Sequence, residues 1–493
     1  MKFYSTRNKK AEVSGAEAVC RGISDEGGLF VPQSFPEFSS EQIKAFCGEP
    51  YENVAAQVIG EFLPELKNEL PEYTRAAYSR FDGDPAPLVK VFDKTYVLEL
   101  WHGPTHAFKD IALTLLPYLL QGSKKLLGNL STTLIPVATS GDTGKAALEG
   151  FSGVGGTAVA VFYPDGGVSD LQRLQMITTE GDNVFVSAVK GNFDDAQTAV
   201  KKAFTDTELK SALAKLKIEL SSANSINFGR LAPQITYYFT AYADLAEGKQ
   251  IRFGDKVDFC VPSGNFGDIL AGYYALKMGL PVGRLICASN INNVLADFIS
   301  TGTYDARREF RKTSSPSMDI LVSSNLERLV FDLSGENDEL TASRMAKLKE
   351  EGVYSLTPHE AEAMLRVFAA GYASEEEVAD TVAEYFDEYG YIIDPHTAVA
   401  AAVAAKTRDD NTPVVILSTA SPHKFAASVL KAIEERPTGN ELKDLQKLEE
   451  VTALEVPESL INLPTKEKIF TDCIELGDVN GTIIAFAERL GKK

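Results

Sequence analysis

The segment whose residues could do the most chemistry extends from Glu99 to Asp110 and contains one lysine, Lys109. A lysine is usually a solvated surface residue, but Lys109 follows a predicted apolar strand and has apolar neighbours on both sides. Partial burial at the end of that strand would lower the pKa of its ammonium group. The free amine could then form a Schiff base with a carbonyl compound. We therefore expect Lys109 to be catalytic and to lie in the first turn of a helix that Thr105 caps and that extends to residue 120.

A second candidate site is the turn at residues 262–268, which joins a predicted strand to a helix that ends near residue 278. Gly264 and Gly267 allow the backbone to turn tightly and expose successive N–H groups. The helix dipole adds partial positive charge, so such a turn can bind a phosphate without any basic side chain. An ordinary strand-to-helix turn has the same pattern, and both interpretations remain open at this point.

A third strand–turn–helix segment covers residues 138–145 and could bind an anion in the same way. Its Gly-Lys pair resembles part of a P-loop, but that motif requires Gly six residues before the lysine and Ser or Thr after it. Those positions hold Thr139 and Ala146, so we exclude a nucleotide phosphate site. Neither this turn nor the one at 262–268 has the three spaced glycines of a dinucleotide-binding turn.

The fourth candidate segment, residues 417–425, ends a late apolar strand. A hydroxyl group there could meet a ring nitrogen across the sheet edge. His423 in this segment is better explained as a structural or surface histidine. The five histidines of the chain show no metal-ligand spacing, and no G-x-S-x-G motif is present. Zinc and serine-hydrolase chemistry are therefore disfavoured, and we expect no metal site.

The elements that position these turns alternate between short apolar strands and amphipathic helices. Strands are predicted at 96–100, 133–138, 157–162, 184–189, 257–261, 285–288 and 414–417. Strands that alternate with helices predict parallel sheets covered on both faces, and their spread along the chain predicts two such sheets. In folds of this kind ligands bind beyond the carboxyl ends of the strands, which is where the four segments lie.

We divide the chain into three domains. Residues 1–95 form an N-terminal domain of short helices and turns, and residues 96–250 form a smaller α/β domain with the reactive lysine. Residues 251–493 form a larger α/β domain with the second Gly-rich turn. Within it, residues 335–390 are rich in Glu, Ala and Leu and predict a helical insertion, including one helix over 360–389.

Composition and charge exclude several classes of protein. The chain has 493 residues and a formal net charge of −20, which disfavours nucleic acids and anionic membranes as partners. The five cysteines are odd in number and lack C-x-x-C spacing, so neither a disulfide framework nor a zinc site is expected. The N-terminus lacks the apolar core of a signal peptide, and no apolar run has the length of a membrane span. We expect a reduced, soluble, cytoplasmic protein.

Taken together, these segments resemble the threonine synthase family, in the longer class found in many bacteria and in fungi. The resemblance extends over almost the whole chain. It is carried by residues 4–7, 27–32, 102–110, 139–144, 191–195, 263–267, 324–328 and the segment around Thr419. The sequences around the lysine and at 263–267 are specific to this family, because relatives such as cysteine synthase and serine dehydratase differ at both places.

The resemblance implies fold type II of the pyridoxal-phosphate enzymes, similar to the tryptophan synthase beta chain. Two doubly wound sheet domains would surround a cofactor cleft, with the N-terminal domain alongside. It implies that Lys109 holds pyridoxal 5'-phosphate as a Schiff base and that Thr419 meets the pyridine nitrogen. The implied phosphate loop consists of Gly264, Asn265, Phe266, Gly267 and Asp268. At 421–423 the family more often has His-Pro-Ala, so His423 is assigned no role.

The resemblance also implies the substrate contacts. The turn that grips the amino-acid carboxylate would consist of Ser140, Gly141, Asp142 and Thr143. The contacts to the substrate phosphate would be Lys145, Asn325 and Arg328. We expect a monomer or a homodimer that acts on a small molecule.

The implied reaction converts O-phospho-L-homoserine and water to L-threonine and phosphate, the last step of threonine biosynthesis. The amine of Lys109 would transfer protons while the cofactor ring holds electrons. Two alternatives remain open. One is a phospho-lyase on the same scaffold that yields 2-oxobutyrate, ammonia and phosphate, and the other is a relative that binds the cofactor without catalysis.

Overall fold

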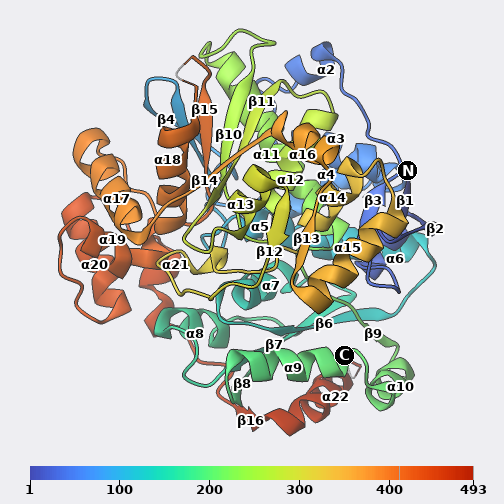
Figure 1. Cartoon of the computed structure of the whole chain (residues 1–493). Coiled ribbons are helices and arrows are strands. Elements are labelled where there is room, and N and C mark those ends of the chain that lie inside the picture. The colour runs from blue at the N-terminus through green and yellow to red at the C-terminus, as the bar shows by residue number, and fades with distance from the viewer. Residues whose placement is uncertain (410, 492–493) are drawn as a thin grey trace.

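The computed structural model describes residues 1–409 and 411–491 and contains two main β-sheets, one above the other in Figure 1. Across the larger sheet the strands are β14 (Phe368–Tyr372), β11 (Val282–Ser289), β10 (Val257–Pro262), β15 (Val414–Ser418), β5 (Thr95–Glu99) and β4 (Leu88–Phe92). Across the smaller sheet they are β16 (Cys473–Glu475), β8 (Val184–Lys190), β7 (Thr157–Pro164), β6 (Thr132–Ala138) and β9 (Ile218–Leu220). All neighbouring pairs are parallel except β4 with β5.

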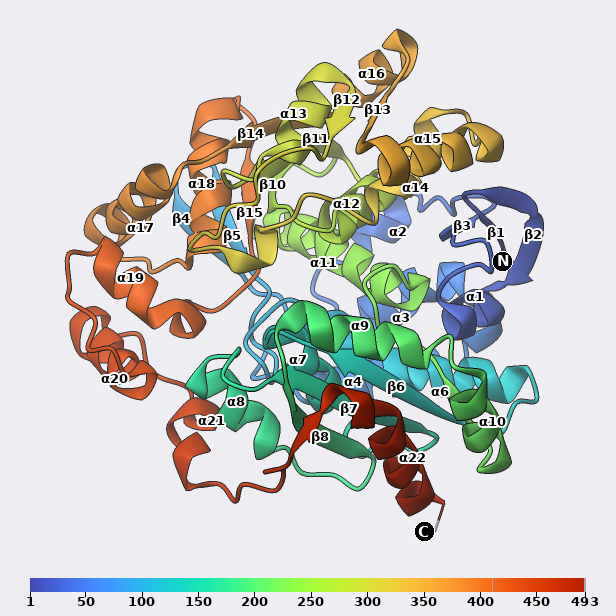
Figure 2. The same ribbon diagram turned by 60° about the horizontal axis from the view of Figure 1, so that its bottom comes forward.

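Helices cover both faces of the smaller sheet. Successive residues of β7 point to opposite faces and all of them are buried. Phe162 belongs to the apolar cluster formed with α9 (Phe193–Ala203) and α22 (Val479–Leu490), which lie side by side in Figure 2. Val161 belongs to the cluster that includes α7 (Asp142–Phe151) on the other face. Such two-sided burial is typical of parallel strands and confirms the predicted α/β class.

The N-terminal residues form a small antiparallel sheet that packs, together with helices, around one long helix. This sheet consists of β2 (Asn8–Ser14), β1 (Lys2–Ser5) and β3 (Phe30–Pro32). The long helix, α11 (Phe228–Glu247), is buried over most of its length, and α3 (Tyr51–Phe62) packs along it. The predicted N-terminal domain beside two sheet domains is therefore confirmed.

Sheet membership divides the chain differently from the expected ranges 96–250 and 251–493. The predicted strand before Lys109 is β5, which pairs with β15 in the larger sheet rather than with the smaller one. Near the C-terminus, β16 returns to the smaller sheet and pairs with β8. Both pairings join strands that are far apart in the sequence, which local patterns do not reveal. As a result, Lys109 and the turn at 262–268 follow strands of the same sheet.

The predicted helix over 360–389 is wrong as a single element. The structure has α16 (Pro358–Leu365), the edge strand β14 and then α17 (Glu375–Tyr389). Ser374 and Glu377 form a capping box that starts α17, so the second helix begins afresh after the strand. Gly371 lets β14 approach the neighbouring helix closely, because a Cβ atom there would lie 2.9 Å from Val403. The capping box was the sequence signal for this break.

The seven strands predicted from the sequence correspond to β5, β6, β7, β8, β10, β11 and β15, with ends that shift by a few residues. The short edge strands β4, β9, β14 and β16 were not predicted. Within the described residues, each helix is too short or too polar to serve as a membrane-crossing segment.

Candidate active site

Three neighbouring parallel strands of the larger sheet, β10, β15 and β5, end at one edge of that sheet. Gly264, Thr419 and Lys109 follow these three strands in turn, so the structure brings the predicted cofactor residues to one edge. The lysine segment is held there by main-chain hydrogen bonds. Leu100 N–H donates to the Ser418 carbonyl and Phe108 N–H to the Thr419 carbonyl, both at 2.9 Å.

Lys109 begins helix α5 (Lys109–Leu113), as predicted, and its amine is largely withdrawn from solvent. Burial lowers the pKa of the Lys109 ammonium, and the positive charges of Lys424 and Arg230 lower it further. The nearest carboxylate opposes this shift, since Asp142 Oδ2 lies 3.9 Å from Lys109 Nζ. The environment therefore favours the free amine that Schiff-base chemistry requires.

The turn before Lys109 differs from the prediction that Thr105 caps the helix. Thr105 instead donates its N–H and its hydroxyl to the carboxylate of Asp110, at 2.7 and 2.6 Å. Burial raises the pKa of Asp110 to about 6. The predicted single helix is two helices, α5 and α6 (Leu116–Leu126), and Pro117 lies in the first turn of the second. This closed turn fixes the direction in which Lys109 leaves the sheet.

The turn at 264–267 has the geometry of an anion nest. Phe266 adopts a left-handed conformation with φ of 62°, and its side chain is buried. The carbonyls of Gly264 and Asn265 accept from the Ser323 hydroxyl at 2.9 Å and from the Asn325 N–H at 3.0 Å. Among the described residues, the N–H groups of positions 264 to 267 donate none of the recorded hydrogen bonds. They are therefore available to a phosphate at the start of α12 (Gly267–Lys277).

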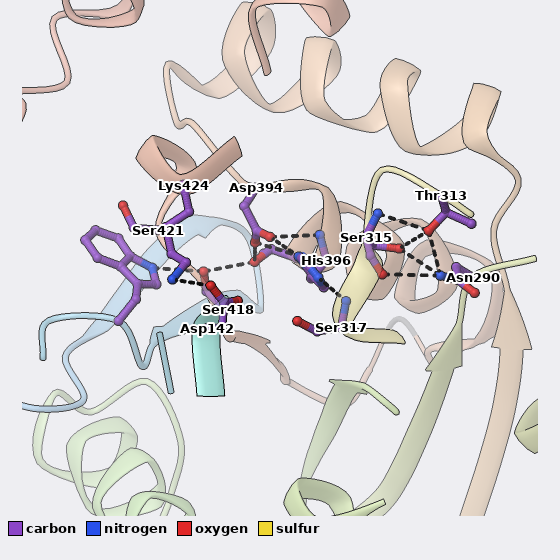
Figure 3. Close-up of polar contacts among 12 residues, drawn as sticks. Asp142, Asn290, Thr313, Ser315, Ser317, Asp394, His396, Ser418, Ser421 and Lys424 are labelled. Carbon is purple, nitrogen blue, oxygen red and sulfur yellow. Dashed lines mark hydrogen bonds and ion pairs between the residues drawn. The ribbon is translucent and has the colours of Figure 1, made fainter. Parts of the chain in front are cut away.

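A buried polar network supports this turn from behind (Figure 3). The His396 Nδ1 atom lies 2.6 Å from the Asp394 carboxylate, and His396 Nε2 accepts from the Ser317 N–H at 3.3 Å. The Ser317 carbonyl in turn packs over Gly264, where a Cβ atom would come within 2.7 Å of it. Any larger residue at Gly264 would displace the turn. Sequence reasoning missed this support, because nothing local links residues 317 and 396.

Asp268 directly follows the turn, and one oxygen of its carboxylate bonds to α11. Its carboxylate accepts from Tyr237 OH at 2.6 Å and from Tyr238 OH at 3.0 Å, both on α11. Burial raises the pKa of Asp268 to about 6. The side chain thus anchors α12 against α11, and the predicted place of Asp268 in the phosphate loop stays a prediction.

The turn at residues 140–143 lies beside Lys109 at the start of α7. Thr139 Oγ1 accepts from the N–H groups of Gly141 and Gly144, both at 3.0 Å. Gly141 has φ of 140°, a conformation that favours glycine. Within the described chain, the N–H groups of Asp142 and Thr143 donate none of the recorded hydrogen bonds. They are therefore available to an anion, while the carboxylate-binding role that the resemblance implies for Ser140 to Thr143 stays a prediction.

The Lys145 side chain makes its recorded contacts outside the turn at residues 140–143. Its ammonium pairs with Glu149 and donates to Thr179 Oγ1 at 3.3 Å. It lines a separate polar cavity of about 290 Å³, together with Gln175 and Lys466. Within the described residues no contact between Lys145 and Lys109 is recorded, and the predicted contact of Lys145 with the substrate phosphate stays a prediction.

Arg328 and Asn325 are buried together behind the phosphate turn. Arg328 donates Nε to the Phe30 carbonyl at 3.0 Å, Nη2 to the Ile226 carbonyl at 2.6 Å and Nη1 to Asn325 Oδ1. Burial lowers the pKa of this guanidinium. These bonds tie the N-terminal sheet to the site, while the predicted contacts of Arg328 and Asn325 with a substrate phosphate stay untested.

Arg230 is a candidate that sequence reasoning missed. It lies in the first turn of α11, donates Nη1 to the Ala223 carbonyl at 2.8 Å, and leaves Nε buried with no partner in the described structure. Burial lowers its pKa to about 10. Its positive charge also contributes to the lowered pKa of Lys109. A buried guanidinium that lacks a carboxylate partner points to an anionic ligand, and the signal was an arginine in an otherwise apolar helix.

Comparisons with known proteins agree with this geometry. Residues 84–419 match the family model described as "Pyridoxal-phosphate dependent enzyme". Residues 2–78 match "Threonine synthase N terminus" and residues 397–473 match "Threonine synthase, C-terminal". The site and the sheet arrangement thus define the class: the chain is a member of the pyridoxal-phosphate-dependent enzymes.

Individual relatives identify the family within this class to which the chain belongs. The chain is 39% identical over 440 residues to threonine synthase of Pseudomonas aeruginosa, covering 88% of this chain and 90% of that protein. Identity to the Saccharomyces cerevisiae threonine synthase is 35%, covering 99% and 98%. Human "Threonine synthase-like 1" is 40% identical over 85% of this chain, but the chain spans only 58% of that protein. The chain belongs to the threonine synthase family.

Solved structures agree. A PLP-bound threonine synthase from Brucella melitensis superposes with a TM-score of 0.89 at 36% identity and covers 99% of both chains. Yeast threonine synthase gives 0.89 at 34% identity, over 100% and 99%. The predicted family and the predicted cofactor, pyridoxal phosphate, are thereby confirmed. The residues present fit this cofactor: a desolvated amine at Lys109 and a nest of free N–H groups at 264–267.

The buried side chain of His106 provides a test of the packing around the turn that precedes Lys109. His106 has φ of 57°, is buried, and its Nε2 lies 2.9 Å from Ser459 Oγ. Burial lowers its pKa to about 3. The folded protein therefore binds fewer protons here than the unfolded chain, so stability should fall as the pH drops below about 6.5. Urea unfolding of the wild type and of His106→Gln at pH 7.5 and 5.5 should show a smaller acid-induced loss in the variant. Equal losses in both proteins would contradict a neutral, buried His106.

Proposed function

We propose that this protein converts O-phospho-L-homoserine and water to L-threonine and phosphate, with pyridoxal phosphate bound to Lys109. The observation that carries the proposal is the desolvated Lys109 amine at the same sheet edge as the free N–H groups of residues 264–267. Membership of the threonine synthase family, and similarity to the threonine synthases of Pseudomonas aeruginosa and yeast, support it.

The charges around Lys109 suit a substrate with a phosphate and a carboxylate. Lys424 and Arg230 add positive charge close to Lys109. Burial alone would raise the pKa of Asp142, but the ammonium groups of Lys424 and Lys109 lower it well below its usual range, so it is ionised. With Lys109 neutral, the two positive charges of Lys424 and Arg230 thus exceed the single ionised carboxylate of Asp142, in a protein whose net charge is −20. This local excess of positive charge favours an anionic substrate.

Pyridoxal phosphate supplies an electron sink for negative charge that develops on the substrate carbons. The Lys109 amine accepts the proton from the substrate Cα and later returns it. One amine that both accepts and returns protons needs a pKa near neutrality, and burial moves Lys109 in that direction. In this proposal the start of α7 holds the substrate carboxylate on the N–H groups of Asp142 and Thr143, and the unpartnered Nε of Arg230 binds the phosphate that leaves.

Two alternative functions would require different features of the protein. A relative that only binds the cofactor would tolerate an altered lysine or a broken phosphate turn, and both are intact here. A phospho-lyase would release 2-oxobutyrate and ammonia from the same substrate, and analysis of the products separates it from a synthase. We further propose that the protein acts in the cytoplasm as a monomer or homodimer, with no nucleic-acid or membrane partner.

Replacement of the reactive lysine tests the proposal. Lys109→Ala should remove the visible absorbance of the bound cofactor and all threonine formation from O-phospho-L-homoserine. Absorbance spectra and chromatographic detection of threonine and 2-oxobutyrate are the measurements. The control is Lys125→Ala, at an exposed position, which should resemble the wild type. Threonine formation by the Lys109 variant, or 2-oxobutyrate as the main product of the wild type, would refute the proposed reaction.

Arg230 tests recognition of the substrate phosphate. A charge-assisted hydrogen bond of about 1.5–3 kcal/mol corresponds to a loss of roughly 10- to 150-fold in kcat/KM. Arg230→Met should show a loss of this size with O-phospho-L-homoserine, and Arg230→Lys should recover part of it. Cofactor content, measured by absorbance, serves as the control for folding. Unchanged kcat/KM in a fully loaded Arg230→Met variant would exclude the contact.

A further inference from the structure

The turn expected to bind the substrate carboxylate carries a carboxylate of its own. Asp142 begins α7, and its N–H group and that of Thr143 face the same site as its side chain beside Lys109. An ionised Asp142 repels an incoming carboxylate in this poorly solvated place. Something must therefore offset the charge of Asp142 if the turn is to hold the substrate.

Lys424 provides that offset from a different part of the fold. Its Nζ lies 2.8 Å from Asp142 Oδ1 and donates to the Thr105 carbonyl at 3.0 Å, with only 8% of the side chain exposed. In Figure 3, Lys424 extends from its helical turn toward Asp142. Gln172 Nε2 also donates to Asp142 Oδ1, at 3.1 Å. Lys109 Nζ is more distant, at 3.9 Å, so Lys424 is the principal partner.

The ion pair also connects the two halves of the protein. Asp142 starts a helix of the smaller sheet, while Lys424 lies in the short helical turn Pro422–Phe425, just after β15 of the larger sheet. An ammonium group has three N–H donors, and the structure records two acceptors for Lys424. One donor therefore remains for a further oxygen, such as that of a substrate carboxylate at the start of α7.

We propose that Lys424 determines substrate carboxylate binding by neutralising Asp142, so that the Ser140–Thr143 turn can accept an anion. This inference rests on the proposed function, because it takes the substrate to be an amino acid. Without Lys424, the negative charge of Asp142 lacks its principal partner. It then repels the substrate carboxylate and interacts only with the more distant Lys109. Lys424 is a positioning and specificity residue in this account, and it transfers no proton.

The proposal differs from a purely structural role in one respect. If the ion pair only holds the two halves together, then loss of either partner does similar damage, and loss of both repairs nothing. If Lys424 acts by neutralising Asp142, removal of the Asp142 charge makes Lys424 dispensable. Asp142→Asn keeps the size of the side chain and the acceptor for Gln172, and it removes the charge.

The experiment compares four holoenzymes: wild type, Lys424→Met, Asp142→Asn and the double variant. Lys424→Met should raise KM for O-phospho-L-homoserine by about 30-fold or more, consistent with an unpaired buried carboxylate. The double variant should return KM to within about 3-fold of the wild type, allowing for the lost contact of Lys424 itself. Lys431→Met, at an exposed position on α19 (Ala426–Ala432), is the matched control and should not differ from the wild type.

A second readout is independent of turnover. L-homoserine shares the carboxylate but lacks the phosphate, and its binding is followed by the change in cofactor absorbance. The affinity for L-homoserine should follow the same pattern as KM. Binding should be weak in Lys424→Met and should be restored in the double variant. If the wild type makes no threonine yet shows this order, the proposed function fails and the role of Lys424 stands.

A double variant as impaired as Lys424→Met, in KM and in L-homoserine binding, would overturn the inference. If Lys424→Met alone does not fold, the double variant, which has no unpaired charge, is compared with Asp142→Asn. Equal affinity of these two for L-homoserine supports neutralisation as the role of Lys424. If the double variant instead binds L-homoserine much more weakly than Asp142→Asn does, Lys424 contributes to binding independently of the Asp142 charge.

Discussion

The desolvation of one amine is the constraint on which the site depends. Water stabilises a lysine ammonium, so burial of Lys109 at a sheet edge shifts it toward the neutral form. That position follows from the parallel order β10–β15–β5, which places the ends of three strands together. The closed Thr105–Asp110 turn then directs Lys109 away from the sheet. The remaining charges, Lys424, Arg230 and Asp142, adjust the same equilibrium and prepare the site for an anion.

The proposed phosphate site depends on a different physical principle from the Lys109 amine. The turn at 264–267 offers main-chain N–H groups and a helix dipole, and its carbonyls are held by the 323–325 segment. The Asp394–His396 pair fixes Ser317 over Gly264, so the turn is preorganised by groups that do not themselves face it. Binding by backbone donors explains how an acidic protein can hold a phosphate with few basic side chains nearby.

Much of this site could be predicted from local sequence, and most of the failures have a non-local cause. Lys109 in the first helical turn and the Gly-rich turns at 140–143 and 264–267 follow from short-range patterns. The pairing of β5 with β15 does not, because it joins residues more than 300 positions apart. Side-chain direction is equally non-local: Lys145 lines a polar cavity with Gln175 and Lys466, and among the described residues Arg230 has no recorded carboxylate partner. The edge strand β14 is a different case: it lies within helix-forming composition, and the local capping box that begins α17 was the signal for it.

The most direct test of the central claim is to locate the cofactor bond. Borohydride reduction of the purified holoenzyme, followed by proteolysis and mass spectrometry, identifies which lysine carries the reduced phosphopyridoxyl group. The account predicts the label on Lys109, in stoichiometric amount. A label on another lysine, such as Lys145 or Lys424, or no label at all in a protein that retains its cofactor, would contradict it.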